Sequence, residues 1–572
     1  MPLLLRNALR AAPAALVLLL AACSASPPRD EPSEPAAQPA EPAVEASADK
    51  DLTAALMAAE FAWQDGRGAA AAKHFLRAAT LSPDAKIAEH ATRVALVSKQ
   101  FDLAAQAVAR WRELDPKALG LWQADAVLAM QAGDDEQADG LLVELLTKHD
   151  EDGRKLAAQA LAVAAQPDKA IAALERLAKR EQLAGDADAL LVLAQTAQQL
   201  KQETLALRFA DRAVAAAPKD ARTSFWRGHL RLRAGDKKNA ALDFAEAVRL
   251  APDDNDYRLT QAALLSDEGE SALAAKLLFA GKHEDETLAA AAAYSARAND
   301  KALMRQAYDA LEALPEPRPD ARLELLGQMA ELVELRDAAL AWYREVPRGE
   351  QWLSSQLRIP VLLDDSGKEK EAFEHIAQLR AGGIEDDEKL ADSYLLEGEL
   401  LARHGRREEA IAVHTRGLEV LPDERRLLYA RALTNEQLGK EEEAERDLRR
   451  IVALDPKDAD AMNALGYTLA DHGRNLDEAQ GLIEQALAMK PDEAAILDSL
   501  GWVLFRRGQL DDAVARLRRA FELQPDAEIA AHLGEVLWQQ GKHDEARAAW
   551  QKGKDKEGDN ETLLETIKRL DK

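Results

Sequence analysis

The sequence is poor in cysteine, in aromatic residues and in net positive charge. Cys23 is the single cysteine among 572 residues, which excludes an internal disulfide and any zinc site built on several cysteines. Aromatic residues make up only 5% of the chain, whereas Ala and Leu are abundant, which favours helix over strand. The formal net charge of −27 repels nucleic acid, so we expect no nucleic-acid partner. A basic protein partner suits this charge, and a solvated surface that resists self-association explains it equally well.

Motifs of catalysis and metal binding are also missing. The chain contains no G-x-x-x-x-G-K-[ST], G-x-G-x-x-G or H-E-x-x-H motif, and its 11 histidines are scattered. The run His283-Glu284-Asp285-Glu286 is the one cluster with the composition of a cation site, and a solvated acidic loop is the simpler interpretation. We therefore expect no enzymatic activity, no catalytic residue, no metal and no cofactor.

Residues 1–22 have the organisation of a secretory signal. Arg6 and Arg10 form a basic start, and the apolar run 11–20 follows it. This run is too short to span a bilayer as a helix, and small residues come directly after it. We predict that residues 1–22 are a cleaved signal peptide.

The end of this signal, Leu20-Ala21-Ala22-Cys23, resembles the lipobox of bacterial lipoproteins. The resemblance implies cleavage before Cys23, lipid attachment at its thiol, and acylation of the new amino terminus, for example with palmitate. More than one acyl chain gives stable anchoring. By resemblance to lipoprotein sorting rules, Ser24 favours the outer membrane, with the protein facing the periplasm and held by its lipid alone. An ordinary signal with an incidental cysteine is the alternative.

Residues 23–50 are predicted to be a lipidated cysteine followed by a disordered tether. Six prolines lie among Ala, Ser and Glu, and no apolar periodicity is present. Fully extended, residues 24–50 reach roughly 80 Å from the membrane.

The rest of the chain repeats itself at intervals of 33 to 35 residues. The markers are a small residue and a loop glycine in each repeat: Ala410, Ala444, Ala479, Ala513 and Ala546, with Gly405, Gly439, Gly473, Gly508 and Gly541. A fixed period of this length is typical of a solenoid of helical hairpins. Residues 51–572 have room for about 15 such repeats.

Each marker has a physical reason. Gly501 and its equivalents must be small because the first helix of a repeat approaches the second closely there. Gly508 is suited to the positive φ that ends a helix. Asp511 and Asp512 then favour the start of the second helix, and Pro525 ends it.

The run Leu500-Gly501, Leu504, Ala513, Leu517, Ala520 and Pro525 resembles the tetratricopeptide repeat (TPR) pattern. The resemblance implies an all-α fold, a TPR α-solenoid superhelix. Its register blurs near 150–185 and 280–320, and the proline-rich stretch 314–319 cannot be helical throughout. We therefore predict two sub-arrays, 51–314 and 320–560, and a capping helix at 561–572.

In TPR arrays the first helix of each repeat lines the concave surface. The TPR resemblance places four aromatic residues there, with a basic residue beside them: Tyr467, Trp502, Phe505, Trp538 and Arg506. Aromatic anchors in a groove are typical of binding hot spots, so these five are the candidate protein-binding residues. Packing of the same rings between neighbouring repeats is the alternative.

The layout is similar to one family in particular, the outer-membrane TPR lipoproteins of the LbcA type. The specific likeness lies in NALGYTLA from Asn463, DSLGWVL from Asp498 and AHLGEVLW from Ala531. That family implies a non-catalytic adaptor that binds a periplasmic carboxyl-terminal processing protease and its substrates, basic peptidoglycan hydrolases, and promotes their proteolysis. The alternative is a TPR lipoprotein scaffold of another envelope machine, for polysaccharide export, pilus or secretin assembly, or peptidoglycan synthase activation.

Overall fold

The computed structural model describes residues 51–163 and 167–571. These residues are helical, with no β-strand among them. The predicted signal, Cys23 and the tether lie outside the described residues. Internal contacts divide the chain into unit 1, Met1–Glu316, and unit 2, Pro317–Lys572. The division falls in the proline-rich stretch 314–319, and this stretch connects two helices that end at Glu312 and begin at Asp320.

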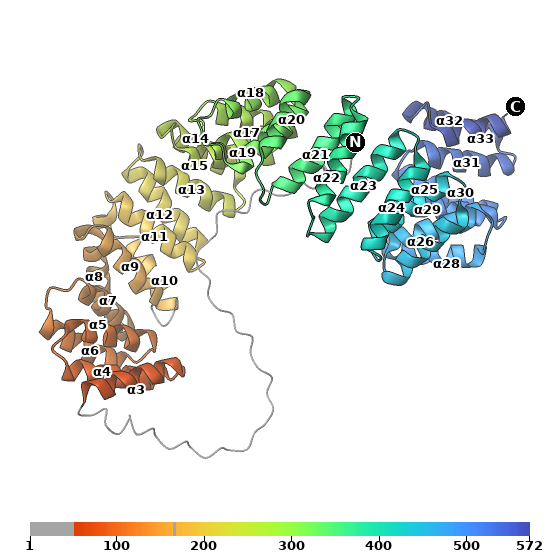
Figure 1. The fold of residues 1–572 in the computed structure, drawn as a ribbon. Coiled ribbons are helices and arrows are strands. Elements are labelled where there is room, and N and C mark those ends of the chain that lie inside the picture. Colours follow the sequence, from red (N-terminus) through yellow and green to blue (C-terminus); the bar gives the residue numbers. More distant parts are fainter. Residues whose placement is uncertain (1–50, 164–166, 572) are drawn as a thin grey trace, which may run out of the picture. The chain divides into compact units, whose positions relative to one another are not determined.

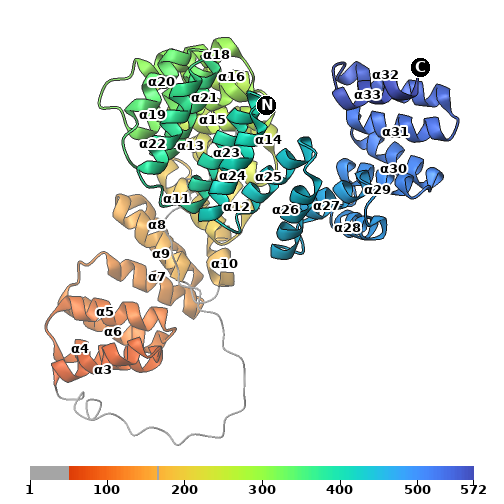
Figure 2. The same ribbon diagram turned by 45° about the vertical axis from the view of Figure 1, so that its right-hand side comes forward.

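Unit 1 is a stack of antiparallel helical hairpins in chain order, from α3 in red to α18 in green (Figure 1). Figure 2 shows the first four of these helices, α3, α4, α5 and α6, side by side at the start of unit 1. Its helices are α3 (Leu52–Gln64), α4 (Gly68–Leu81), α5 (Ala85–Val97), α6 (Phe101–Leu114), α7 (Gly120–Ala132), α8 (Asp135–Lys148), α9 (Glu151–Val163), α10 (Pro167–Leu177), the 3₁₀ turn η1 (Glu181–Leu183), α11 (Ala187–Gln199), α12 (Glu203–Ala216), α13 (Ala221–Arg233), α14 (Lys237–Leu250), α15 (Asn255–Asp267), α16 (Ser271–Phe279), α17 (Asp285–Arg297) and α18 (Lys301–Glu312).

Unit 2 repeats the same arrangement and ends in a single helix, α33, which packs on the last hairpin. Its helices are α19 (Asp320–Leu332), α20 (Arg336–Glu345), α21 (Trp352–Asp365), α22 (Glu369–Ala381), α23 (Asp387–Arg403), α24 (Arg407–Val420), α25 (Arg425–Gln437), α26 (Glu441–Leu454), α27 (Ala459–Asp471), α28 (Leu476–Met489), α29 (Ala494–Arg506), α30 (Leu510–Leu523), α31 (Ala527–Gln539), α32 (His543–Lys556) and α33 (Glu561–Leu570). In each hairpin the odd-numbered helix is the first helix and the even-numbered one is the second.

Each hairpin turn that the structure describes in full contains a residue with positive φ. In most hairpins this residue is glycine, for example Gly508 at 78° and Gly541 at 77°. Four hairpins instead hold another residue in this left-handed conformation: Lys99, Lys201, Asn299 and Glu334. Backbone hydrogen bonds close the turn in either case, as when the amide of Gln202 donates to the carbonyl of Ala197 at 2.8 Å. The first helix therefore ends in the same way whether or not the sequence has a glycine there.

Glycine in the middle of a first helix allows the second helix to approach. A Cβ at Gly501 would lie 2.5 Å from the Leu517 side chain and 3.2 Å from the Ala513 carbonyl oxygen. A Cβ at Gly534 would lie 2.0 Å from Nε1 of Trp550. The small residues that mark the repeat are therefore required by this close contact between the two helices of a hairpin.

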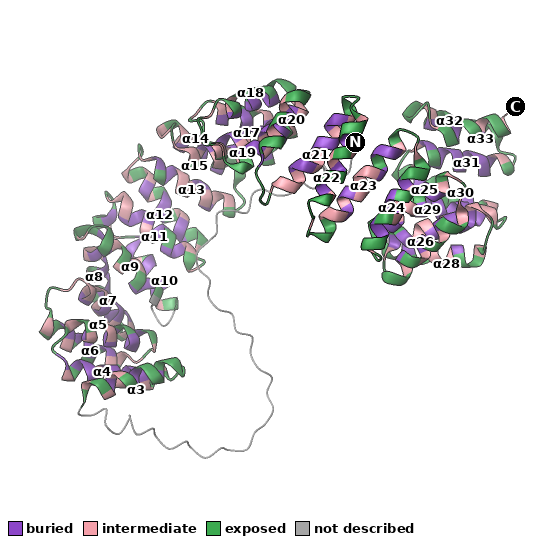
Figure 3. Ribbon diagram, viewed as in Figure 1, coloured by how far each residue is buried: buried purple, intermediate pink, exposed green. Residues whose placement is uncertain are grey.

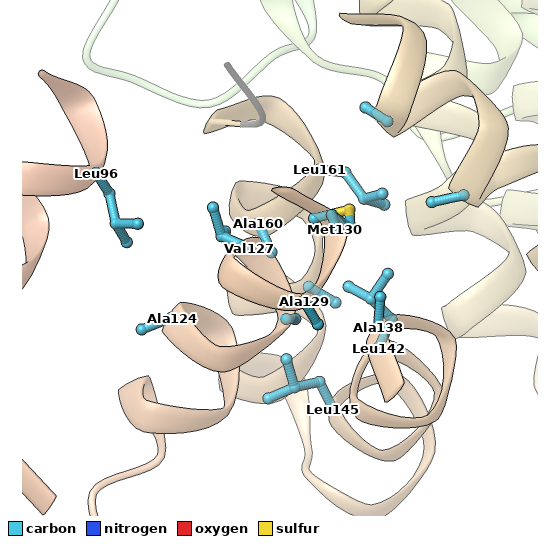
Figure 4. Close-up of a cluster of buried hydrophobic side chains, with 14 of the residues drawn as sticks. Leu96, Ala124, Val127, Ala129, Met130, Ala138, Leu142, Leu145, Ala160 and Leu161 are labelled. Carbon is cyan, nitrogen blue, oxygen red and sulfur yellow. The ribbon is translucent and has the colours of Figure 1, made fainter. Parts of the chain in front are cut away.

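Alternate faces of the helices are buried and exposed along each unit (Figure 3). In the two largest clusters of buried apolar side chains, successive hairpins pack against one another, so the core extends from one hairpin to the next. Figure 4 shows part of the unit 1 core, where Met130 of α7, Leu142 of α8 and Leu161 of α9 gather between the helices. Within the described residues, no helix is both long enough and apolar enough to cross a bilayer.

Candidate functional site

The five candidate residues lie on three successive first helices of unit 2. Tyr467 is on α27, Trp502, Phe505 and Arg506 are on α29, and Trp538 is on α31. Helix α29 packs against both α27 and α31. The repeat therefore places side chains that are about one period apart in the sequence on adjacent helices, as with Tyr467 and Trp502, which are 35 residues apart.

Three of the four aromatic rings form a connected cluster with a histidine that the sequence analysis did not select, and two of them contact this histidine directly. The Trp502 ring stacks on His532 at a centroid distance of 4.3 Å and contacts Phe505 at 5.1 Å. Tyr467 also approaches this histidine, with its hydroxyl 3.5 Å from Nε2. We call Tyr467, Trp502, Phe505 and His532 the ring cluster.

Trp538 belongs to a different group of rings. It stacks on Trp550 at 5.5 Å and meets the edge of His543 at 4.1 Å, and both of these residues are on α32. The guanidinium of Arg547 lies 5.3 Å from the Trp538 ring centroid. Among the described residues, no ring contact joins Trp538 to the ring cluster, so the structure separates one predicted anchor from the other three.

The ring cluster is only partly accessible to solvent. Trp502 is 7% exposed and its indole Nε1 donates to the carboxylate of Asp471 at 3.0 Å. Arg506 donates to the backbone carbonyl of Asp471, so the structure directs this cation towards the preceding repeat. Tyr467 and Phe505 are partly exposed, as is Trp538. Trp502 thus packs between neighbouring repeats, while the other three rings retain a surface that a partner can contact.

His532 forms a buried ion pair with Asp498. Its Nδ1 lies 2.8 Å from a carboxylate oxygen of Asp498, and the two side chains are 5% and 9% exposed. Burial opposes the charged imidazolium, but Asp498, with Glu528 and Asp471 nearby, outweighs it and raises the pKa of His532. The pair links α29 to α31. The two residues are 34 positions apart, which is one repeat, and this spacing is the sequence signal that could have identified them.

Acidic groups border the ring cluster. Asp471 accepts the indole hydrogen bond of Trp502, and burial raises the pKa of Glu436 on α25. Glu436 accepts a hydrogen bond from Thr468 at 2.8 Å and forms no ion pair with the described residues. The buried Asn463 Oδ1 on α27 also has no hydrogen-bond partner among the described residues. Apolar ring edges beside acidic groups are suited to contact with a basic protein segment.

Unit 1 contains a hollow that the sequence analysis did not predict. It has a volume of about 690 Å³ and is walled mainly by first helices α5, α7 and α9, and its lining includes Leu96, Val127 and Leu156 of these helices and Trp111 of the second helix α6. The charged residues of its lining, Arg93 and Glu89, pair with each other at 2.8 Å. The hollow is therefore electrically neutral, in contrast to the acidic border of the ring cluster.

None of these surfaces has the composition of a metal site. Within residues 51–163 and 167–571, no group of three or more His, Cys, Asp or Glu side chains is arranged to hold a metal ion. The candidate residues instead form surface for contact with another protein, on the first helices α27, α29 and α31.

Part of unit 2 matches a model of a known family. Residues 395–459, 439–494, 463–511 and 499–559 match the tetratricopeptide repeat model. The helical hairpins of both units have the same architecture, so the chain folds as an all-α solenoid of TPR-like repeats. This fold is typically a non-catalytic scaffold for contacts between proteins.

Among curated proteins, the chain is similar to the TPR repeat-containing protein PA4667 of Pseudomonas aeruginosa. The two are 35% identical over 210 residues, which is 37% of this chain and 35% of that protein. The match thus spans about a third of the relative's length.

Solved structures of other repeat proteins align with short parts of the chain. The thermophilic TPR protein TTC0263 of Thermus thermophilus is 25% identical over 32% of this chain and 97% of its own, with a TM-score of 0.29. MamA of Desulfovibrio magneticus RS-1 is 20% identical over 32% of this chain and 98% of its own, with a TM-score of 0.25.

Proposed function

We propose that the protein is a non-catalytic lipoprotein adaptor of the bacterial outer membrane. It binds a periplasmic carboxyl-terminal processing protease and brings basic peptidoglycan hydrolases to it for degradation. Its lipid is attached at Cys23, and its repeats face the periplasm. The observation that carries the proposal is the combination of a lipobox-like sequence at the chain's single cysteine with an array of TPR-like helical repeats, a fold that typically holds other proteins.

The surface around the ring cluster supports a protein partner with apolar and basic groups. Phe505 and Tyr467 offer partly exposed ring edges, and the carboxyl groups of Glu436 and of Asp471, which pairs with Arg506 at 3.7 Å, lie beside them. A partner that brings Lys or Arg to Glu436 gains an ion pair that the described residues of the free protein lack. Cell-wall hydrolases bind an anionic polymer, so a basic surface on them is expected on physical grounds.

A second candidate function shares the anchor and the array. The protein would then be a scaffold of another envelope machine, for polysaccharide export, pilus or secretin assembly, or peptidoglycan synthase activation. The neutral hollow in unit 1 favours this candidate, because it offers a second contact surface whose chemistry differs from that of the ring cluster.

The adaptor role is tested by the amounts of periplasmic hydrolases in cells that lack the protein. We expect one or more hydrolases to accumulate on deletion and to return to their normal amounts when the wild-type gene is restored. A Phe505→Asp variant, which places a charge on the ring edge, is expected to restore them poorly. Leu454→Asp is the matched control, because Leu454 is 37% exposed on the second helix α26. Unchanged hydrolase amounts on deletion would exclude the adaptor role.

A further inference from the structure

The hollow in unit 1 has an apolar lining that the described residues leave partly uncovered. In Figure 4, Leu96 of α5 stands opposite Ala124 and Val127 of α7, and all three line the hollow. Val97, another lining residue, is 52% exposed. The volume of about 690 Å³ is in the range of sites that enclose a ligand in proteins. The hollow is therefore large enough to hold a short peptide segment.

The polar groups of the hollow are suited to a peptide backbone. The Nε2 amide of Gln123 on α7 donates to Oε1 of Gln159 on α9 at 3.2 Å, and both residues line the hollow. This bond uses one donor and one acceptor, so the remaining groups of the two amides are available to peptide N–H and C=O groups. Glu89 and Arg93 already pair with each other. An occupant can thus form hydrogen bonds here without bringing a charge into the hollow.

Two lysines lie next to the lining of the hollow. Lys86 is one helical turn before Glu89 on α5, and Lys117 directly precedes Ala118 ahead of α7; Glu89 and Ala118 are lining residues. The backbone amide of each lysine donates to a neighbouring aspartate, whereas neither ammonium group forms an ion pair with the described residues. Residues 85–117 contain six basic and four acidic side chains, a formal charge of +2. The edge of the hollow is therefore suited to an occupant with carboxylates at its two ends.

The stretch that precedes α3 contains a segment of matching composition. Residues 39–45 read PAEPAVE, and Val44 is the one aliphatic side chain larger than alanine in residues 24–50. Glu41 and Glu45 lie on either side of it. The two prolines favour an extended conformation that leaves the backbone groups open to hydrogen bonds, and at about 3.1 Å per residue it separates the two glutamates by about 12 Å. Neighbouring packed helices are about 8–10 Å apart, so this spacing is close to the one between α5 and α7.

The segment also lies at a suitable distance along the chain. The described structure begins at Asp51, the N-cap of α3, and Val44 precedes it by seven residues, which span up to about 23 Å. Two steps of about 8–10 Å lead from α3 through α5 to α7, so Val44 can reach the hollow. Because segment and hollow belong to one chain, the effective concentration of the segment is about millimolar, and a weak contact suffices for occupancy.

We infer that residues 39–45 of the same chain occupy the hollow in unit 1, with Val44 against its apolar lining and the two glutamates beside the two lysines. The inference does not rest on a lipid at Cys23, because every group involved belongs to the chain itself. It leaves residues 24–38 as the free part of the proposed tether, which reaches about 45 Å when extended. A partner that binds the hollow must first displace the segment.

The test is the rate at which a thiol placed in the hollow reacts with a maleimide. The chain that begins at Ser24 lacks Cys23, so a Val97→Cys substitution supplies its single thiol. Leu242→Cys, at a site 63% exposed on α14, gives the rate of an uncovered thiol. We expect Val97→Cys to react more slowly than this reference, because the segment covers it.

Substitutions in the segment then release the thiol. Val44→Asp places a charge against the apolar lining, and we expect it to speed the reaction of Val97→Cys by up to about tenfold, the factor that burial of one valine side chain contributes. Ala36→Asp is the matched control, because it adds the same charge outside the segment and should leave the rate unchanged. All of these tether substitutions lie outside the helical array.

Exchange of charges tests the pairing of the ends. With Glu41 beside Lys117, a Lys117→Glu substitution should speed the reaction about two- to fivefold at low salt, since exposed ion pairs are weak. Adding Glu41→Lys to it restores the pair with reversed signs and should slow the reaction again. A double variant that reacts as fast as Lys117→Glu alone contradicts this pairing.

The remaining outcomes are equally decisive. Equal rates for Val97→Cys with and without Val44→Asp overturn the inference. An equal increase with Ala36→Asp also overturns it, because the effect would then belong to the charge of the whole stretch. Protection that disappears on dilution assigns the hollow to a second copy of the chain and overturns it as well. None of these results involves a protease, so the adaptor function stands or fails separately, on the hydrolase amounts.

Discussion

Gly534 provides the sharpest test of how the hairpins pack. It lies in the middle of α31, and a Cβ there would be 2.0 Å from Nε1 and 2.4 Å from Cδ1 of Trp550, a ring that is 2% exposed. Overpacking costs about 1–3 kcal/mol in general, and because the enclosed ring has little room to move we expect the upper part of that range here, about 2–3 kcal/mol. Alanine in a helix interior recovers about 1 kcal/mol relative to glycine. We therefore expect Gly534→Ala to destabilise the last hairpin by about 1–2 kcal/mol.

The assay is hydrogen–deuterium exchange of the intact chain, read in α31 and α32. Local opening in repeat arrays is measured better by exchange than by a single unfolding midpoint. A loss of 1–2 kcal/mol speeds exchange about 5- to 30-fold. Gly481→Ala is the matched control, because Gly481 is also inside a helix, α28, and nothing lies within 4 Å of its Cβ position. The control should slow exchange slightly. If Gly534→Ala exchanges no faster than wild type while the control behaves as expected, the close-contact explanation of the repeat glycine is refuted.

The remaining predictions concern the turns, the buried histidines and the ring cluster. Lys201 has a φ of 59° where other hairpins have glycine, so Lys201→Gly should stabilise the α11–α12 hairpin by up to about 1 kcal/mol, seen as slower exchange there. Burial, with a smaller contribution from Arg431, lowers the pKa of His414 from its ordinary 6.5 to about 4; thermal stability should fall as the pH drops from 6.5 towards 4, and His414→Leu should lack this fall. The pKa of His532 is raised instead, so its ion pair stabilises unit 2 below that pKa and is lost as the pH rises through it; unfolding midpoints measured from about pH 6 to 10 should decline in wild type and not in His532→Gln. Trp502→Ala should cost about 3–5 kcal/mol in α29 because the ring is buried, and Phe505→Ala should cost less, as measured by exchange.

The repeat can be predicted from the sequence because local backbone conformation and close helix contacts determine which residues mark it. Gly508 ends a helix at positive φ, and Gly501 allows the approach of Leu517, so both recur at a fixed period. The register is harder to follow near 280–320, where Asn299 takes the same left-handed conformation in place of a glycine. There the turn is held by its backbone hydrogen bonds, and no residue type marks it in the sequence.

The candidate site could be predicted only in part. The repeat period placed Tyr467, Trp502 and Phe505 on neighbouring first helices, which the structure confirms. The burial of Trp502 depends on His532, a residue of the next repeat whose ring stacks on it. Trp538 turns to Trp550 because that large ring fills the space opposite Gly534. Contacts of this kind depend on side-chain size across repeats, and periodicity does not report them.

The central claim, that the protein acts by holding a protease and its substrates, is tested most directly by affinity purification. The lipidated protein is isolated from cross-linked cell envelopes, and the proteins bound to it are identified by mass spectrometry, with the Phe505→Asp variant processed in parallel. We predict that wild type recovers a carboxyl-terminal processing protease together with cell-wall hydrolases, and that the variant recovers less of one or both. Recovery of an outer-membrane pore or a peptidoglycan synthase in their place would contradict the account.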